Sequence, residues 1–260
     1  MTIVKCAMAA MVVGAVLNTD AEAEKLYRGA PIKVLHVTGG CCHDYAAQSD
    51  LIPALIKARG DFKVDVIGPD WKAAKVKLAK ADWAAGYDVI VYNICDAHNT
   101  DTTLIHNITK VHIEDATPAV MIHCALHSFH WNLGSDKKKY EGEEWVKVLG
   151  ITSANHGPKA AITVKPVLKE HPIMKGLPAT WTTPGGELYN SHEVLPTATP
   201  LAMGDNGNAK QGPQVCIWVN QCEQARVFGT SLGHHNTTMQ EPVYGDMLVR
   251  GLLWACEKLK

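Results

Sequence analysis

The feature that most constrains the fold is a regular alternation of short apolar runs with helix-like stretches, which begins at Pro31. Runs of this kind indicate strands, and they occur at 32–37, 63–67, 87–92 and 119–122. The last two are apolar enough for strands that are buried on both faces. Strands that alternate with helices predict a doubly wound α/β fold, with a mostly parallel sheet covered by helices on both faces.

The stretches between these strands carry helix signals. The first helix is expected to start at an N-cap on Ser49 and to end at Gly60, with Pro53 close enough to its start to be tolerated. Further helices are expected near 72–84 and 101–114.

The second half of the chain has a different sequence pattern, because Pro and Gly residues break it into short segments. Strands are expected at 161–164, 201–203, 215–219 and 226–228, and these should extend the sheet. An amphipathic helix at 242–257 closes the chain. With no internal repeat in the sequence, residues 24–260 are predicted to form a single domain.

The N-terminal segment is typical of a secretory signal. Lys5 precedes an apolar run at 6–17, and Ala21 and Ala23 supply small residues at the spacing that a signal peptidase accepts. The run is short for a bilayer span, and a buried helix or an N-terminal anchor are the alternatives. We predict a signal peptide at 1–23 and a periplasmic or secreted mature protein with no integral membrane segment.

Charge and cysteine content limit the partners. Twenty-five Lys and Arg against 26 Asp and Glu leave no basic excess for nucleic acid, so a small molecule is the expected partner. Without Cys6, seven cysteines remain, so at least one thiol should be free. A bridge between Cys216 and Cys222 is left open, and no CxxC spacing supports a zinc ribbon.

Histidines are numerous, 13 in all, and several follow predicted strands. In an open parallel sheet, ligands bind outside the carboxyl ends of the strands. His43, His123 and His234 each follow a strand and are therefore expected to converge. Six other histidines are interpreted as ordinary core, surface or loop residues: His36, His106, His112, His130, His156 and His171.

Short motifs in order along 32–257 resemble the ThuA-like (trehalose-utilisation) family. They are His43-Asp44, the strand 87–92, Ile122-His123-Cys124-Ala125, His171-Pro172-Ile173, Gly176-Leu177-Pro178, Glu187-Leu188-Tyr189-Asn190, 226–234 and Gly251-Leu252-Leu253-Trp254-Ala255. The chain departs from the family pattern at Met121, His127 and His235, which makes it richer in imidazole. The resemblance implies a flavodoxin-like, class I glutamine-amidotransferase-like fold and a role in sugar metabolism, with members linked to 3-keto glycosides and some to a divalent metal.

Three imidazoles suit Zn²⁺ or a similar divalent ion, and the expected ligands are His43, His123 and His234. A metal beside a sugar carbonyl acidifies the adjacent C–H, which Glu187 or His127 would deprotonate, giving a lyase or hydrolase of oxidised (3-keto) glycosides. The residues expected to orient substrate hydroxyls, or to stack on the ring, are Asp96, Tyr189, His192 and His235, with Trp131 or Trp181.

Other functions stay open at this point. Cys124 could act as an amidotransferase-like nucleophile with His234 as its base, although Ile122 and Leu126 are larger than a sharp nucleophile turn accepts. A two-carboxylate glycosidase would use Glu187 with Asp96 or Glu193. A non-catalytic sugar-binding accessory protein is the third alternative, and the chain could form a homo-oligomer.

Overall fold

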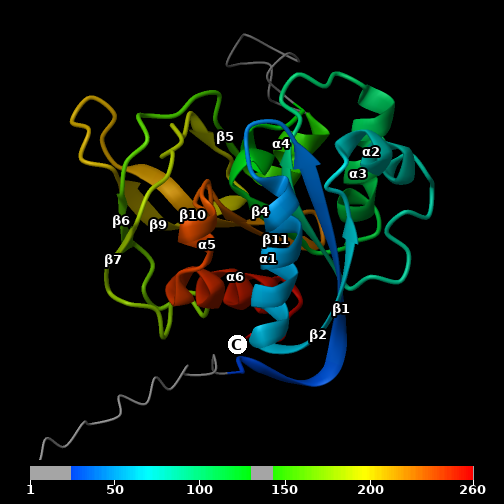
Figure 1. Ribbon diagram of the computed structural model, residues 1–260, viewed down its shortest axis with the longest axis horizontal. Helices are drawn as coiled ribbons and strands as arrows, with labels where there is room; N and C mark the ends of the chain where they lie inside the picture. Colours follow the sequence, from blue (N-terminus) through cyan, green and yellow to red (C-terminus); the bar gives the residue numbers. More distant parts are fainter. Residues whose placement is uncertain (1–24, 130–142, 260) are drawn as a thin grey trace, which may run out of the picture.

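The computed structural model describes residues 25–129 and 143–259, which form a nine-stranded sheet covered by helices on both faces (Figure 1). The predicted signal peptide at 1–23 lies outside the described residues, as do His130 and Trp131. Within the described ranges, no helix has the length and apolar character needed to cross a bilayer.

One half of the sheet is parallel. Its five strands run in the order β2-β1-β3-β4-β11 and are β1 (Tyr27–Gly40), β2 (Gly60–Ile67), β3 (Val89–Cys95), β4 (Ala119–Ile122) and β11 (Ala225–Thr230). This order reverses between β1 and β3, which is the arrangement of flavodoxin-like folds and creates a crevice at the carboxyl ends of the strands. The predicted fold class is confirmed.

The other half of the sheet is antiparallel and continues from β11. Its strands are β10 (Gln214–Cys222), β9 (Ala198–Asp205), β6 (Ile162–Pro166) and β7 (Trp181–Thr183). A separate two-stranded ribbon pairs β5 (Ile151–Thr152) with β8 (Glu193–Val194). The short strands expected after residue 150 therefore do extend the sheet.

The helices divide between the two faces because strand side chains alternate. On β3, Val89 and Val91 pack in the core beneath α1 (Tyr45–Ala58) and α6 (Pro242–Ala255), which lie side by side in Figure 1. Ile90 and Tyr92 point the other way, into the core beneath the remaining long helices. Those are α2 (Trp71–Leu78), α3 (Thr102–Ile113) and α4 (Glu144–Leu149), while α5 (Asn236–Met239) and the 3₁₀ helix η1 (His123–His127) are short.

The start of α1 differs from the expectation. The N-cap is Asp44, whose Oδ1 accepts a hydrogen bond from the Ala47 amide at 3.2 Å, so the helix begins four residues before Ser49. The Ser49 hydroxyl instead donates to the Ala46 carbonyl within the helix. Asp is as strong a cap as Ser, and the earlier start places Pro53 in the helix interior.

Two histidines interpreted as structural are buried as neutral rings. Burial lowers the pKa of His36, on β1, to about 3, and neither of its ring nitrogens has a hydrogen-bond partner among the described residues. Burial also lowers the pKa of His112 to about 4, while its Nδ1 donates to the Thr117 carbonyl at 2.6 Å. Both rings lie in the interior away from solvent.

These two pKa values predict acid sensitivity. The unfolded chain binds a proton on each ring below pH 6.5 and the folded chain does not, so the free energy of unfolding falls as pH drops toward 4. The expected slope is about 1.4 kcal/mol per pH unit for each histidine. In urea unfolding at pH 7, 5.5 and 4.5, His36→Leu should reduce this slope by about 1.4 kcal/mol per pH unit. An unchanged slope in His36→Leu would contradict the assignment.

Candidate functional site

The three histidines that follow parallel strands meet at one point. His43 follows β1, His123 follows β4 directly and His234 follows β11. One ring nitrogen from each lies within 4.8 Å of the other two, and the ring centroids are 4.8 to 5.3 Å apart. The predicted convergence is therefore found, at the carboxyl ends of three strands.

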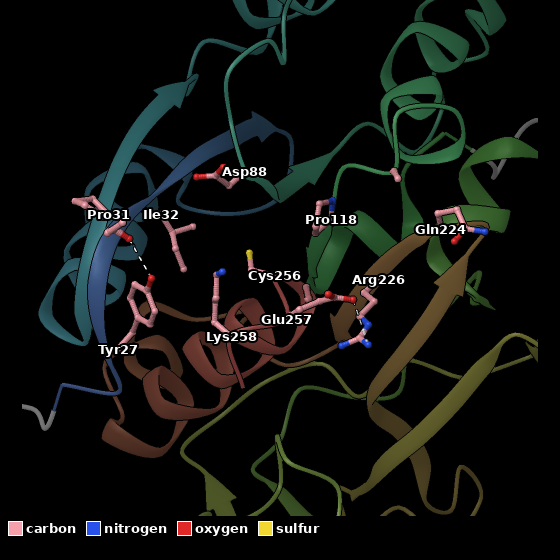
Figure 2. Close-up of a pocket in the computed structure, with 13 residues that line it drawn as sticks. Tyr27, Pro31, Ile32, Asp88, Pro118, Gln224, Arg226, Cys256, Glu257 and Lys258 are labelled. Carbon is pink, nitrogen blue, oxygen red and sulfur yellow. Dashed lines mark hydrogen bonds and ion pairs between the residues drawn. The ribbon is translucent and has the colours of Figure 1, made fainter. Parts of the chain in front are cut away.

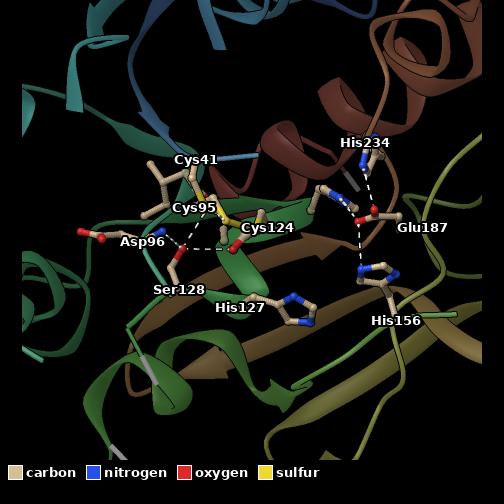
Figure 3. The surroundings of a disulfide bond; sticks show 12 residues. Cys41, Cys95, Asp96, Cys124, His127, Ser128, His156, Glu187 and His234 are labelled. Atoms are coloured by element: carbon tan, nitrogen blue, oxygen red, sulfur yellow. Dashed lines mark hydrogen bonds and ion pairs between the residues drawn. A yellow bond between two sulfur atoms is a disulfide. The ribbon is translucent and has the colours of Figure 1, made fainter. Parts of the chain in front are cut away.

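Glu187 contacts this cluster from the antiparallel half of the molecule. It lies between β7 and β8, and its Oε1 is 3.0 Å from Nε2 of His234, while Oε2 is 3.8 Å from Nε2 of His123 (Figure 3). Burial alone would raise the pKa of Glu187, but its contacts with these two histidines and the nearby positive charge hold it well below its usual value. The carboxylate is therefore ionised at neutral pH.

His156 and Lys159 complete the surroundings of Glu187. Nε2 of His156 is 3.6 Å from Oε2, and Nζ of Lys159 is 3.5 Å from Oε1. Both were missed from the sequence, where His156 was expected to be an ordinary loop residue. Neither follows a strand of the parallel sheet, so the rule that located the other histidines does not apply to them.

His123 has its ring fixed by backbone and side-chain partners. Its Nδ1 donates to the Ser231 carbonyl at 2.6 Å, which leaves Nε2 as an acceptor facing the Tyr189 hydroxyl at 3.1 Å. Burial lowers the pKa of this ring, although Glu187 and the carbonyl act in the opposite direction. The φ angle of +46° is unusual for a residue other than glycine and turns the chain sharply between β4 and η1.

His43 is the member of the cluster without partners. Neither ring nitrogen makes a hydrogen bond with any described residue, although both atoms are buried. Burial, followed by the nearby rings of His123 and His234, lowers the pKa of His43 to about 3. Buried polar atoms are almost always satisfied, so an unpartnered neutral imidazole beside two others is an unusual arrangement.

The donor set fits a divalent metal on these observations. Histidine ligands usually donate their second ring N–H to a carbonyl or a carboxylate, which fixes the ring. His123 has that contact to Ser231 and His234 has it to Glu187, while His43 offers nitrogens with no competing partner. Three neutral imidazoles are standard ligands for Zn²⁺ and similar ions.

An open cavity of about 610 Å³ leads to the cluster. Its lining residues come from the β1–α1 loop and the β11–α5 segment, and are Cys42, His43, Asp44, His234, His235, Asn236 and Thr237. Nδ1 of His235 lies 3.2 Å from Nδ1 of His234, so His235 is part of the site as expected.

A chain of side-chain hydrogen bonds holds the two cavity segments together. The Asn236 amide donates to Asp44 at 2.8 Å, the Gln48 amide donates to Asn236 at 3.1 Å, and the Asn93 amide donates to Gln48 at 2.9 Å. The mouth of the cavity is thereby anchored to α1 and to the centre of the sheet.

A second cavity, of about 510 Å³, lies at the opposite end of the strands (Figure 2). Ile32, Asp88, Pro118 and Arg226 line it near the amino ends of β1, β3, β4 and β11, together with the segment that follows α6. None of the clustered histidines is among its lining residues, so it is a separate feature.

Several residues expected in the site are placed elsewhere. Asp96 accepts hydrogen bonds from Trp71 Nε1 at 2.6 Å and Asn99 Nδ2 at 2.7 Å, and it lies across the disulfide from His234 in Figure 3. His192 is exposed and lines another cavity with Asn190, Gln214 and neighbouring residues.

Of the other residues expected in the site, some lie outside it and some lie within it. Glu193 pairs with Thr152 in the two-stranded ribbon, and Trp181 packs against the core. Tyr189 is in the site, where its ring lies 4.5 Å from that of His123 and stacks on that of His127 at 3.7 Å. The Nε2 atom of His127 lies 2.8 Å from the Ser153 hydroxyl.

Cysteines border the histidine cluster. Cys95 and Cys124 form a disulfide that the sequence did not suggest, whereas Cys216 and Cys222 are free thiols buried on β10. Because its sulfur is bonded, Cys124 is not a free nucleophile in this structure, and the alternative of an amidotransferase-like hydrolase has no structural support.

Comparisons with known proteins identify the family of the chain. The family model described as "ThuA: Trehalose utilisation" matches residues 33–255. A ThuA-like protein from Parabacteroides merdae ATCC 43184 has 19% identity and a TM-score of 0.69, over 88% of this chain and 92% of that one. One from Bacteroides uniformis ATCC 8492 has 19% identity and a TM-score of 0.67, over 89% and 94%.

More distant structures share the fold alone. A beta-galactosidase from Rahnella sp. R3 matches with 14% identity and a TM-score of 0.58, over 89% of this chain but only 32% of that one. No curated protein matches the chain.

Beneath the site, β1 approaches β3 so closely that we predict a strong requirement for glycine at Gly40. A Cβ on Gly40, whose φ is +120°, would collide with the Cys95 carbonyl, so Gly40→Ala should lower the free energy of unfolding by more than about 2 kcal/mol. Gly207 has φ of +74° and no described atom near its Cβ position, so Gly207→Ala should cost only about 1 kcal/mol. Equal losses in urea unfolding would refute the steric explanation.

Proposed function

Because the chain belongs to the ThuA family, which is described by trehalose utilisation, we propose that it is an exported enzyme that cleaves an oxidised (3-keto) glycoside at a divalent metal held by three histidines. The observation that carries this proposal is the meeting of His43, His123 and His234 at one cavity, with the outer nitrogens of two rings already engaged by a carbonyl and a carboxylate. A module that only binds sugars has no need of three clustered imidazoles.

The residues of the site divide into holding and positioning roles. A divalent ion such as Zn²⁺, bound by the three imidazoles, would supply a Lewis acid for a sugar carbonyl. The Ser231 carbonyl and Glu187 accept the Nδ1–H of His123 and the Nε2–H of His234, so the other nitrogen of each ring would be the ligand atom. His235 and Asn236, at the cavity mouth, present polar groups to sugar hydroxyls.

Proton abstraction needs a base near the carbon beside the carbonyl. We assign this role to Glu187, with His127 as the alternative. Glu187 is ionised and contacts two of the three clustered histidines directly, whereas His127 stacks on Tyr189 and its Nε2 lies 2.8 Å from the Ser153 hydroxyl. Loss of the C–H proton to the carboxylate sends its electrons into a new C=C bond and expels the glycosidic oxygen, which takes up a proton.

The metal and the reaction are tested together. Purified protein should hold about one divalent ion per chain, and His123→Ala or His234→Ala should lose most of it, together with at least about a hundredfold of kcat/KM toward 3-keto-disaccharides. His106→Ala, which removes a half-exposed ring paired with Glu144, is the matched control and should change neither. Elemental analysis and monosaccharide release give the two readouts.

The same assays distinguish the competing functions. Glu187→Gln should retain the fold and lose activity, and a larger loss in His127→Gln would move the base to that residue. Metal-free protein that binds glycosides unaltered would indicate the accessory-protein function instead.

Export is tested on the N-terminus. When the full chain is expressed in a Gram-negative host, the periplasmic fraction should contain protein whose mass corresponds to a start at Glu24, and a chain lacking residues 2–23 should stay in the cytoplasm. Uncleaved protein in the soluble cytoplasmic fraction would contradict the proposed signal peptide.

A further inference from the structure

A cluster of sulfur atoms lies beside the histidines and has no part in the proposed reaction. Cys41 follows β1, Cys95 ends β3 and Cys124 lies in η1, so three neighbouring strands deliver them to one place (Figure 3). The sulfur of Cys41 is 3.7 Å from that of Cys95, which is bonded to Cys124. Cys41 is exposed, whereas Cys95 and Cys124 are each 5% exposed.

We propose that reduction of the Cys95–Cys124 disulfide opens a second metal site, specific for a soft cation, in which the two thiolates and His43 are ligands and Cys41 is the adjacent fourth donor. One donor atom each from His43, Cys95 and Cys124 already lies within 4.8 Å of the other two. The site shares His43 with the histidine cluster, and it stands whether or not the three histidines hold a metal of their own.

The distances suit thiolate coordination. Zinc–sulfur bonds are about 2.3 Å, so two thiolates on a tetrahedral ion lie about 3.8 Å apart. The separation between the Cys41 and Cys95 sulfurs is 3.7 Å, and the peptide N–H of Cys41 donates to the Cys95 carbonyl at 3.1 Å, which fixes the two segments relative to each other. Closure around an ion therefore needs little backbone movement.

The donor types select the cation. Thiolates favour Cu⁺, Zn²⁺ and Cd²⁺ over harder ions. His43 is the remaining nitrogen donor because its ring atoms have no partner among the described residues.

His43 would then serve two alternative ligand sets. In the oxidised protein its partners are His123 and His234, and in the reduced protein Cys95 and Cys124 compete for it. A soft ion bound to the thiolates would remove one imidazole from the histidine cluster. The thiol state of the chain would thus determine which metal occupies this end of the sheet.

Reduction of the disulfide needs an external monothiol of the glutathione class as reductant. The reaction starts at Cys41. The Cys41 thiolate attacks the sulfur of Cys95, forms a Cys41–Cys95 bond and releases Cys124, which takes up a proton. One external thiol then attacks Cys41 and frees Cys95 as a thiol. A second resolves the mixed disulfide on Cys41, so two external thiols leave as one disulfide.

The experiment uses full-length protein and Cd²⁺ as the probe. Oxidised and reduced samples, freed of reductant, are titrated in the presence of a competing chelator while the ultraviolet thiolate-to-cadmium absorption is followed. We expect tight binding of one ion per chain only after reduction. Equal binding before and after reduction would overturn the proposal, because the exposed Cys41 and Cys42 would then account for it.

Variants separate the proposed ligands from nearby thiols. Cys124→Ser should weaken Cd²⁺ binding at least about tenfold, since loss of even an outer contact of a metal ligand costs that much. Cys42→Ser and Cys216→Ser, which remove an exposed neighbour and a buried thiol on β10, should bind within about twofold of wild type. If Cys42→Ser weakened Cd²⁺ binding more than Cys124→Ser does, the ion would be assigned to Cys41, Cys42 and Cys95 instead.

If Cys124→Ser fails to fold, alkylation footprinting of the wild-type chain provides a second test. Reduced wild-type protein is alkylated with iodoacetamide, with and without Cd²⁺, and the modified cysteines are identified by mass spectrometry. Cd²⁺ should protect Cys95 and Cys124 while Cys42 and Cys256 react as before. Equal alkylation of Cys95 and Cys124 in both samples would refute the site.

Discussion

The contact on which the site depends is the parallel pairing of β4 with β11. Their register sets Ile122 opposite Thr230, so the residues that follow, His123 and Ser231, emerge side by side and join through the 2.6 Å hydrogen bond from Nδ1 to the carbonyl. This bond fixes the tautomer of His123 and directs its other nitrogen toward the cluster. His234 lies three residues farther along, so the same pairing brings the second imidazole into place.

The site draws on both halves of the sheet, and each half contributes a different chemistry. The parallel half supplies imidazoles, because its carboxyl ends share one edge. The antiparallel half supplies the carboxylate of Glu187, which reaches the cluster from the connection between β7 and β8. Imidazoles and an ionised carboxylate thus meet in a buried position, where electrostatic interactions are stronger than in water.

The features of the fold and the site that could be predicted from the sequence are those that depend on local contacts along the chain. The β4 strand was predicted at its observed bounds, because a four-residue apolar run between polar segments leaves one interpretation. His43, His123 and His234 were found because a strand end is visible in a sequence. The packing of His156 and Lys159 on Glu187 was not predicted, because it depends on how the antiparallel strands fold back. The Cys95–Cys124 disulfide was not predicted either, because the spacing of these two residues in the sequence does not indicate a bond.

The hydrogen bond between His123 and Ser231 also spans 108 residues of chain. Contacts at such separation form late, since the intervening loop must first be closed. A ribosome-bound chain therefore carries its first two imidazoles long before β11 is synthesised, and it cannot assemble the full cluster until translation is nearly complete. Any ion taken up earlier would meet an incomplete set of ligands, so loading of the proposed metal would belong to the final stage of the protein's biogenesis.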